Sequence, residues 1–216
     1  MEYRHLGRSG LQVSVVGLGC NNFGMRCDFD QSKDVVHRAL DAGITLFDTA
    51  DVYGGQGKSE EFLGKILKGR RQDVVLATKF GMKMGEGPHK SGGSRKYIMS
   101  AVEDSLRRLD TDYIDLYQLH RPDPETPIDE TLRALDDLVR WGKVRYVGCS
   151  NFLAYQVARS LGRAEALGTV RFDSVQPRYN LLFRQAEREL LPLCREEGIG
   201  VIPYNPLAGG FLSGKH

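Results

Sequence analysis

The feature that most constrains the fold is a regular alternation of short apolar runs with longer amphipathic segments. This rhythm predicts consecutive βα units and a parallel sheet, and therefore an α/β fold. The apolar runs predict strands near residues 15–19, 44–48, 74–78, 114–119, 144–149, 173–176 and 200–204. The segments between them predict helices near 31–42, 59–68, 97–109, 127–141, 152–167 and 186–197. Residues 6–13, with glycines between apolar neighbours, predict a short hairpin ahead of the first unit.

Composition limits the classes of function. A hydrophobic content of 41% is typical of a globular domain, and a net charge of +2 argues against a dedicated nucleic-acid surface. The start of the chain has no apolar signal region, and no stretch approaches the ~18 apolar residues of a membrane helix. We therefore expect a cytoplasmic protein with neither nucleic-acid nor membrane partners. We see no internal repeat or linker, which predicts a single domain over residues 1–216.

The cysteines are widely spaced and show no paired metal-ligand pattern, so no metal site is predicted. The four positions are Cys20, Cys27, Cys149 and Cys194. Reduced bystander thiols are the favoured interpretation. Oxidation-sensitive roles for Cys20 and Cys149, which lie near the predicted strand ends, are the alternative.

Polar residues follow three successive apolar runs at the point where each run ends. Asp48 follows Ile44 to Phe47, Lys79 follows Val74 to Thr78, and His120 follows Ile114 to Leu119. Tyr53 lies in the loop after Asp48. The carboxyl ends of parallel strands are where α/β folds place their active sites, so these four side chains are expected to meet.

The four residue types form an acid-base set. A tyrosine hydroxyl titrates near ~10, and a neighbouring ammonium such as that of Lys79 stabilises the phenolate and lowers its pKa. Asp48, on the adjacent strand, is placed to accept a hydrogen bond from Lys79 and orient it. His120 can donate a hydrogen bond to a carbonyl oxygen or share the proton transfer with Tyr53. Together the residues suit proton donation to a carbonyl.

Each of these residues also has a plainer interpretation. Asp48 can cap the turn after its strand, Tyr53 can be an ordinary loop aromatic, and His120 can be a polar strand end without a role. Lys79 is harder to explain in this way, because a lysine that finishes an apolar strand rarely lacks a carboxylate partner. The combination is much less expected by chance than any single member.

Several motifs in one order resemble the aldo-keto reductases. The longest are Gly-Ile-Thr-Leu-Phe-Asp-Thr-Ala-Asp-Val-Tyr-Gly at 43–54 and Gly-Lys-Val-Arg-Tyr-Val-Gly-Cys-Ser-Asn-Phe at 142–152. Thr-Lys at 78–79, Asp-Leu-Tyr-Gln-Leu-His at 115–120, Gln176 and Pro-Tyr-Asn-Pro-Leu-Ala-Gly-Gly at 203–210 continue the series. The resemblance runs nearly end to end, which makes it far more specific than one pattern.

The resemblance implies a (β/α)₈ TIM barrel and a nicotinamide-dependent carbonyl reductase that uses NADP and a small-molecule carbonyl substrate. It implies Tyr53 as proton donor, with Asp48, Lys79 and His120 as its helpers. Ser150, Asn151 and Gln176 would bind the nicotinamide carboxamide, and Tyr204 would stack on the ring. The remaining residues that the resemblance places at the cofactor are Gly19, Cys20, Asn21, Asp48, Asn205, Pro206, Leu207, Ala208, Gly209 and Lys215.

A dinucleotide-binding interpretation of the glycines near the first strand is rejected. Gly17, Gly19 and Gly24 resemble a glycine fingerprint, but the spacing to the third glycine is wrong and no strand with a final acidic residue follows at the expected distance. A tight turn at the barrel mouth explains them better.

The number of predicted elements is smaller than a closed barrel needs. About seven strands and about six helices are readable, whereas a (β/α)₈ barrel has eight of each and normally takes ~250 residues. We expect a C-terminally incomplete barrel that lacks about the last third of the family domain, with closure against a second copy as the alternative. In the resembled family, the residues that grip the adenosine phosphate lie beyond Lys215, so weak or absent cofactor binding is expected.

Two functional classes are consistent with these motifs, together with a truncated, inactive form. The first is an NADP-linked reductase of aldehydes or ketones, similar to bacterial general-stress reductases. The second is a nucleotide-sensing regulatory subunit, similar to the potassium-channel β subunits. His120 favours the enzyme, because the channel subunits carry asparagine there. The glycine-rich loop at 81–95 is expected to border the substrate pocket.

Overall fold

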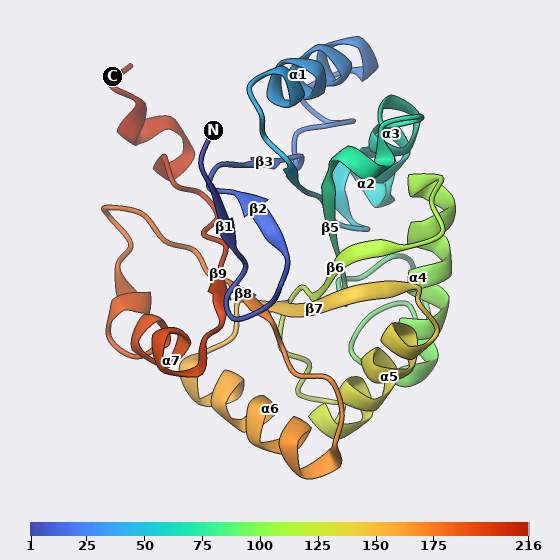
Figure 1. Ribbon diagram of the computed structural model, residues 1–216. Helices are drawn as coiled ribbons and strands as arrows, with labels where there is room; N and C mark the ends of the chain where they lie inside the picture. Colours follow the sequence, from blue (N-terminus) through green and yellow to red (C-terminus); the bar gives the residue numbers. More distant parts are fainter. Residues whose placement is uncertain (216) are drawn as a thin grey trace.

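The computed structural model describes residues 1–215 and contains one curled, seven-stranded parallel sheet (Figure 1). The strands lie side by side in chain order, and every neighbouring pair is parallel. They are β3 (Gly17–Gly19), β4 (Leu46–Asp48), β5 (Val75–Phe80), β6 (Ile114–Leu119), β7 (Val144–Ser150), β8 (Ser174–Gln176) and β9 (Gly200–Val201). The predicted α/β fold is therefore confirmed as a partial (β/α)₈ barrel.

Helices cover the outer face of the sheet (Figure 1). All six predicted helices are present: α1 (Phe29–Asp41), α3 (Lys58–Ile66), α4 (Arg95–Leu109), α5 (Ile128–Arg140), α6 (Ala154–Leu167) and α7 (Leu190–Glu197). Local signals set their starts. Asp28 and Gln31 form a reciprocal capping box at α1, and Ser94 caps α4. Short turns complete the list: α2 (Tyr53–Gln56), η1 (Arg71–Asp73), η2 (Gln185–Glu187) and η3 (Ala208–Ser213).

The strands alternate between two buried environments. On β5, Val75 and Ala77 pack into a small cluster inside the curl of the sheet, whereas Leu76 and Phe80 pack into the large cluster beneath the helices. Since side chains alternate along a strand, Lys79 shares the inner face with Ala77. The fold thus directs the lysine toward the barrel interior.

An antiparallel hairpin covers the amino-terminal ends of the strands. It consists of β1 (Tyr3–His5) and β2 (Gln12–Ser14), so the predicted hairpin is present, with its first strand before residue 6 and its second ending at Ser14. Leu6 and Val13 pack against the inner cluster. Gly7 has a φ of +60°, and a Cβ there would lie 2.4 Å from the Gly198 oxygen, so only glycine fits.

The two outer strands leave the sheet open. Within residues 1–215, no strand pairs with the outer edge of β3 or of β9, so the sheet is a partial barrel. The same residues contain no helix that is both long and apolar enough to cross a membrane.

Candidate active site

A buried ion pair lies at the carboxyl ends of the first strands of the sheet. Lys79 Nζ is 2.7 Å from Asp48 Oδ2 and donates a second hydrogen bond of 2.8 Å to the Thr49 oxygen. The Lys79 side chain is fully buried, and that of Asp48 is 15% exposed. Burial alone would lower the pKa of Lys79, but the nearby Asp48 and Tyr53 raise it above its usual value. Lys79 is therefore a fixed cation.

Two glutamines hold the other oxygen of Asp48. Gln176 Nε2 donates to Asp48 Oδ1 over 2.9 Å and Gln118 Nε2 over 3.2 Å. Gln118 was missed in the sequence analysis. Its signal is a polar residue in the apolar run of β6, and it pairs in register with Lys79, which places both on the inner face.

Tyr53 reaches the ion pair from the segment that follows β4. The Lys79 Nζ atom lies 5.1 Å from the centroid of the Tyr53 ring, and the His120 ring meets Tyr53 edge to face at 5.7 Å. Tyr53 opens the single turn α2 rather than lying in an irregular loop. Gly54 and Gly55 have φ values of 71° and 76°, and this left-handed backbone makes the tight turn.

The pKa of Tyr53 is raised, whereas the neighbouring ammonium in the sequence predicted that it would be lowered. Lys79 does stabilise the phenolate, but burial of the hydroxyl has the larger effect, and Asp48 adds to it. Tyr53 is consequently a neutral phenol at physiological pH, which leaves it with a proton to donate.

His120 is neutral in this environment. Burial, reinforced by the charge of Lys79, lowers its pKa to about 4. The imidazole can donate a hydrogen bond, but it carries no additional proton near pH 7. Of the two roles considered for His120, the lowered pKa favours hydrogen-bond donation over sharing of the proton.

The residues expected at the nicotinamide form one hydrogen-bonded group. Ser150 and Gln176 pair in register, and Ser150 Oγ donates to the backbone oxygen of Gln176 over 2.9 Å. Asn151 Nδ2 lies 3.0 Å from both Ser150 Oγ and the His120 oxygen. Tyr204 Oη donates to Asn151 Oδ1 over 2.9 Å. Through Gln176, this group connects directly to Asp48.

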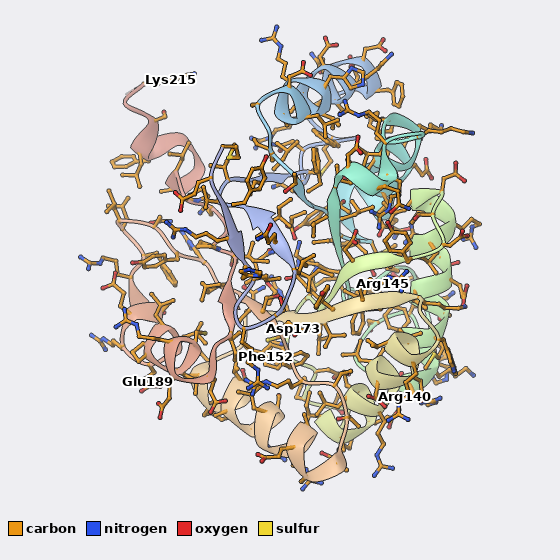
Figure 2. All side chains as sticks on the ribbon, in the orientation of Figure 1. Arg140, Arg145, Phe152, Asp173, Glu189 and Lys215 are labelled. Carbon is orange, nitrogen blue, oxygen red and sulfur yellow. The ribbon has the colours of Figure 1, made fainter. Side chains whose placement is uncertain are left out.

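The loop after Tyr204 is exposed and sharply turned. Asn205 and Ala208 have positive φ, and Gly209 N donates to Asn205 Oδ1 over 2.8 Å. Pro206 and Leu207 lie between them on the surface. Lys215 is at the tip of the C-terminal segment, away from the strands (Figure 2). The structure thus brings the start of this loop to the site and leaves Lys215 apart from it.

Residues 19–21 border Asp48 from the other side. Gly19 pairs in register with Asp48, and a Cβ at Gly19 would have no neighbour within 4 Å. The Cys20 side chain is fully buried, and the backbone N–H of Cys20 donates to the backbone oxygen of Asp48 over 2.8 Å. Asn21 is exposed. The backbone of Cys20 is enclosed as well, because its carbonyl oxygen accepts a bond of 2.8 Å from Ser59 Oγ.

The family model that describes the Aldo/keto reductase family matches residues 15–216. The chain belongs to the aldo/keto reductase family. An oxidoreductase of Bacillus subtilis, YrpG, is 43% identical over the whole chain, which covers 69% of that relative. A probable voltage-gated potassium channel subunit beta of Arabidopsis thaliana is 40% identical, again over the whole chain and 67% of the relative. The L-glyceraldehyde 3-phosphate reductase of Escherichia coli K12 is 38% identical, with 100% of the chain and 64% of the relative covered.

The chain therefore spans about two thirds of the length of the aldo/keto reductase relatives that it matches. Its family chemistry is NAD(P)H-dependent oxidoreduction of carbonyl groups. Two polar atoms of the site are free to bind a polar ligand such as a carbonyl group or a nicotinamide. Gln118 Oε1 and His120 Nδ1 are buried without a hydrogen-bond partner among the described residues. Such atoms are what a bound polar group would satisfy.

The glycine-rich loop of this aldo/keto reductase folds back beside the site. Gly92 N donates to the Gly81 oxygen over 2.9 Å and closes the loop. Gly93 N donates to Asp123 Oδ2 over 2.7 Å, and Thr131 Oγ1 donates to the Gly93 oxygen. These bonds dock the loop after β5 onto the first turn of α5 and onto the loop after β6, the one that begins at His120.

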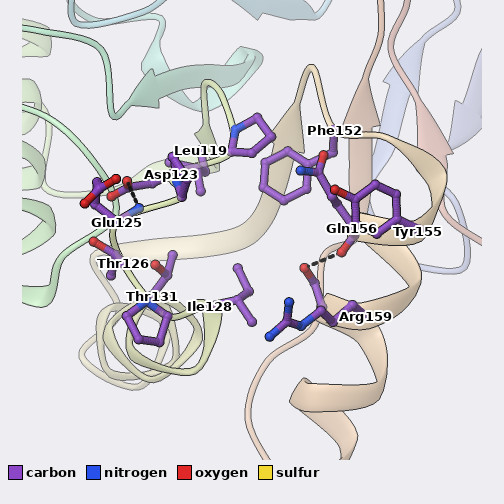
Figure 3. Close-up of a pocket in the computed structure, with 14 residues that line it drawn as sticks. Leu119, Asp123, Glu125, Thr126, Ile128, Thr131, Phe152, Tyr155, Gln156 and Arg159 are labelled. Atoms are coloured by element: carbon purple, nitrogen blue, oxygen red, sulfur yellow. Dashed lines mark hydrogen bonds between the residues drawn. The ribbon is translucent and has the colours of Figure 1, made fainter.

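A separate cavity of about 450 Å³ opens between the first turns of α5 and α6 (Figure 3). Phe152, Tyr155 and Arg159 line one side, and Ile128 and Thr131 line the other. None of the four acid-base residues lines it. It is therefore distinct from the site at the strand ends.

Proposed function

We propose that the protein reduces aldehyde or ketone carbonyls with NADPH, and that Tyr53 supplies the proton. The observation that carries this proposal is the meeting of Tyr53, Lys79 and His120 next to the hydrogen-bonded group of Ser150, Asn151 and Gln176. NADPH rather than NADH, a cytoplasmic location and a single domain over residues 1–216 are parts of the same proposal.

The roles of the chain's own residues follow from their positions. When bound, the reduced nicotinamide supplies the hydride that adds to the carbonyl carbon. Tyr53 transfers its phenolic proton to the carbonyl oxygen, so that an alcohol forms. Lys79 stabilises the resulting phenolate, and Asp48 holds Lys79 in place. His120 donates a hydrogen bond to the oxygen while it gains negative charge.

The cofactor would be held by polar and flat groups on adjacent strand ends. Ser150, Asn151 and Gln176 offer the donors and acceptors that a carboxamide needs, and Tyr204 offers a ring for stacking. Gly19, Cys20, Asn21 and Asp48 would border the nicotinamide. The loop of Asn205, Pro206, Leu207, Ala208 and Gly209, with Lys215 beyond it, would follow the pyrophosphate.

Replacement of Tyr53 by phenylalanine tests the proposal. Reduction of an aldehyde panel by Tyr53→Phe should fall about 10² or more, because general acids typically contribute 10² to 10⁴. NADPH binding should persist. It is best followed by nucleotide fluorescence, because Trp141, 59% exposed, caps the far end of α5. Tyr155→Phe, an exposed tyrosine on α6, is the matched control. A wild-type rate in Tyr53→Phe would refute the role of Tyr53.

A second candidate is a nucleotide-binding regulatory subunit. It is favoured by the 40% identity with the plant channel subunit beta, close to the 43% identity with the bacterial oxidoreductase. Micromolar NADPH binding without reduction of any aldehyde in the panel would select this candidate. Reduction that is lost in His120→Asn would select the enzyme.

A further inference from the structure

A second group of buried polar side chains lies behind the active site, between β5, β6, α3 and α4. Glu60 is fully buried and well satisfied, because Oε1 accepts a bond of 2.6 Å from Thr78 Oγ1 and Oε2 accepts one of 2.6 Å from Arg108 Nε. Thr78 directly precedes Lys79 on β5 and points to the opposite face. The group is therefore one layer away from the ion pair.

Asp51 belongs to this group but is poorly satisfied as a carboxylate. It is 1% exposed, and its Oδ1 atom has no hydrogen-bond partner among the described residues. Its Oδ2 atom has one side-chain hydrogen-bond partner, Tyr97 Oη at 3.4 Å, and the Val52 N–H also acts on the carboxyl group. The Tyr97 hydroxyl can also donate to the Met82 oxygen at 3.3 Å, which leaves it free to accept from Asp51. A buried anion with so few donors is costly, whereas a protonated carboxyl group can donate to Tyr97.

The backbone of Asp51 lies on the segment that joins two active-site residues. Asp51 N donates to the Lys79 oxygen over 3.1 Å, and the Tyr53 N–H donates to the Ala50 oxygen over 3.1 Å. Asp51 reaches outward to α4, and Tyr53, two residues later, reaches inward to Lys79. An anchor at Asp51 therefore fixes the backbone segment that leads to Tyr53, and with it the position of the Tyr53 hydroxyl.

We infer that Asp51 is protonated in the folded protein near neutral pH and is a positioning residue, which fastens the segment that carries Tyr53 to α4. This inference rests on the proposed function for its catalytic consequence, but not for the protonation itself. No role in chemistry is assigned to Asp51, because its carboxyl group does not face the reacting atoms.

The surrounding charges agree with a bound proton. Burial, followed by the charge of Glu60 on α3, raises the pKa of Asp51 to about 8. Arg108 on α4, the Val52 N–H and the Tyr97 hydroxyl act in the opposite direction. Tyr117 on β6 also interacts with Asp51, and Asp104 on α4 interacts with Tyr97 and Arg108. Ionisation above about pH 8 would place a second carboxylate beside Glu60 and weaken the anchor.

The sign of the pH effect on stability follows from the raised pKa. Between the ordinary aspartate value and about pH 8, the folded chain binds one proton more at Asp51 than the unfolded chain. The stability associated with this proton is present at low pH and is lost as the pH rises toward 8. Asp51→Asn, which is neutral at every pH, lacks this dependence.

Thermal unfolding of the full chain from pH 5 to pH 9 tests the protonation without any substrate. The melting temperature of Asp51→Asn should rise relative to wild type as the pH increases, and the difference should level off above about pH 8. Asp34→Asn, an exposed aspartate on α1, is the matched control and should follow the wild type. Parallel curves for Asp51→Asn and wild type would overturn the inference.

The pH profile of carbonyl reduction tests the positioning role. Wild-type kcat should decline above about pH 8, and Asp51→Asn should keep the neutral-pH rate to higher pH. Asp51→Ala should lose roughly ten- to a hundredfold at every pH, because small displacements of a catalytic group cost that much. Equal losses in Asp51→Asn and Asp51→Ala would overturn the role. Absence of any wild-type turnover would refute the proposed function instead, and the melting curves would still decide the protonation.

Discussion

The strongest test of the site's electrostatics is to remove the ammonium of Lys79. Lys79→Met keeps most of the side-chain volume but leaves Asp48 Oδ2 without its partner at 2.7 Å. Removing one member of a buried ion pair typically costs ~3–5 kcal/mol, because the remaining charge is uncompensated. Gln118 and Gln176 still donate to Oδ1, so we expect the lower end, about 3 kcal/mol.

Urea unfolding at pH 7 measures this loss. With a denaturant slope of ~2–3 kcal/mol per molar, the midpoint of Lys79→Met should fall by about 1 M or more. Lys33→Met, at an exposed position on α1, should leave the midpoint nearly unchanged. In the double variant that combines Asp48→Asn with Lys79→Met, the loss of unfolding free energy should be smaller than the sum of the losses in the two single variants, since both charges of the pair are removed together.

Two outcomes would refute this reasoning. A loss below ~1 kcal/mol in Lys79→Met would mean that the pair behaves as an exposed ion pair. Strict additivity in the double variant would mean that Asp48 and Lys79 do not interact in the folded protein.

Three further predictions concern packing, thiols and pH. In urea unfolding, Gly64→Ala should destabilise the chain by ~1–3 kcal/mol, because the new Cβ would lie 2.6 Å from the Arg108 backbone oxygen. Gly162→Ala, with no neighbour within 4 Å, should stabilise it by up to ~1 kcal/mol, and equal effects of the two changes would contradict the close contact at Gly64. Native protein should show one thiol reactive toward a disulfide reagent, Cys27, because Cys20, Cys149 and Cys194 are buried, and fast labelling of a second thiol would contradict this. Between pH 6.5 and about 4, the unfolded chain binds more protons at His120 than the folded chain, so the wild-type free energy of unfolding should fall relative to that of His120→Gln as the pH drops, by up to ~3 kcal/mol. A difference that stays constant over this range would refute the lowered pKa.

The order and type of the main elements were predictable because each βα unit has a distinct pattern of its own. The ends of the elements were less predictable, because they depend on individual residues and contacts. The last strand was expected to reach residue 204 but ends at Val201, shortly before Pro203, which has no N–H to donate to a neighbouring strand. The helix expected from 186 begins at Leu190, after a separate 3₁₀ turn over Gln185–Glu187.

In the candidate site, too, features of a single element were predictable and relations between elements were not. Asp48, Lys79 and His120 were found from single strands, since each ends an apolar run. Gln118 became evident only through its register with Lys79, which is a relation between two strands. The direction of the Tyr53 pKa depended on burial, which a charged neighbour in the sequence does not reveal.

The hairpin beneath the barrel has a consequence for the order of folding. The Arg8 N–H donates to the Gly198 backbone oxygen over 2.7 Å, so the docking site of the hairpin is completed only when the last βα unit is in place. At a synthesis rate of ~5–20 residues per second, residue 198 leaves the ribosome roughly 10–40 s after residue 8. A hairpin forms within microseconds, but contacts so distant along the chain form slowly. Leu6 and Val13 meet Leu46, Val75 and Leu116 of the early strands first, so only the contact with Gly198 must wait for the other end of the sheet.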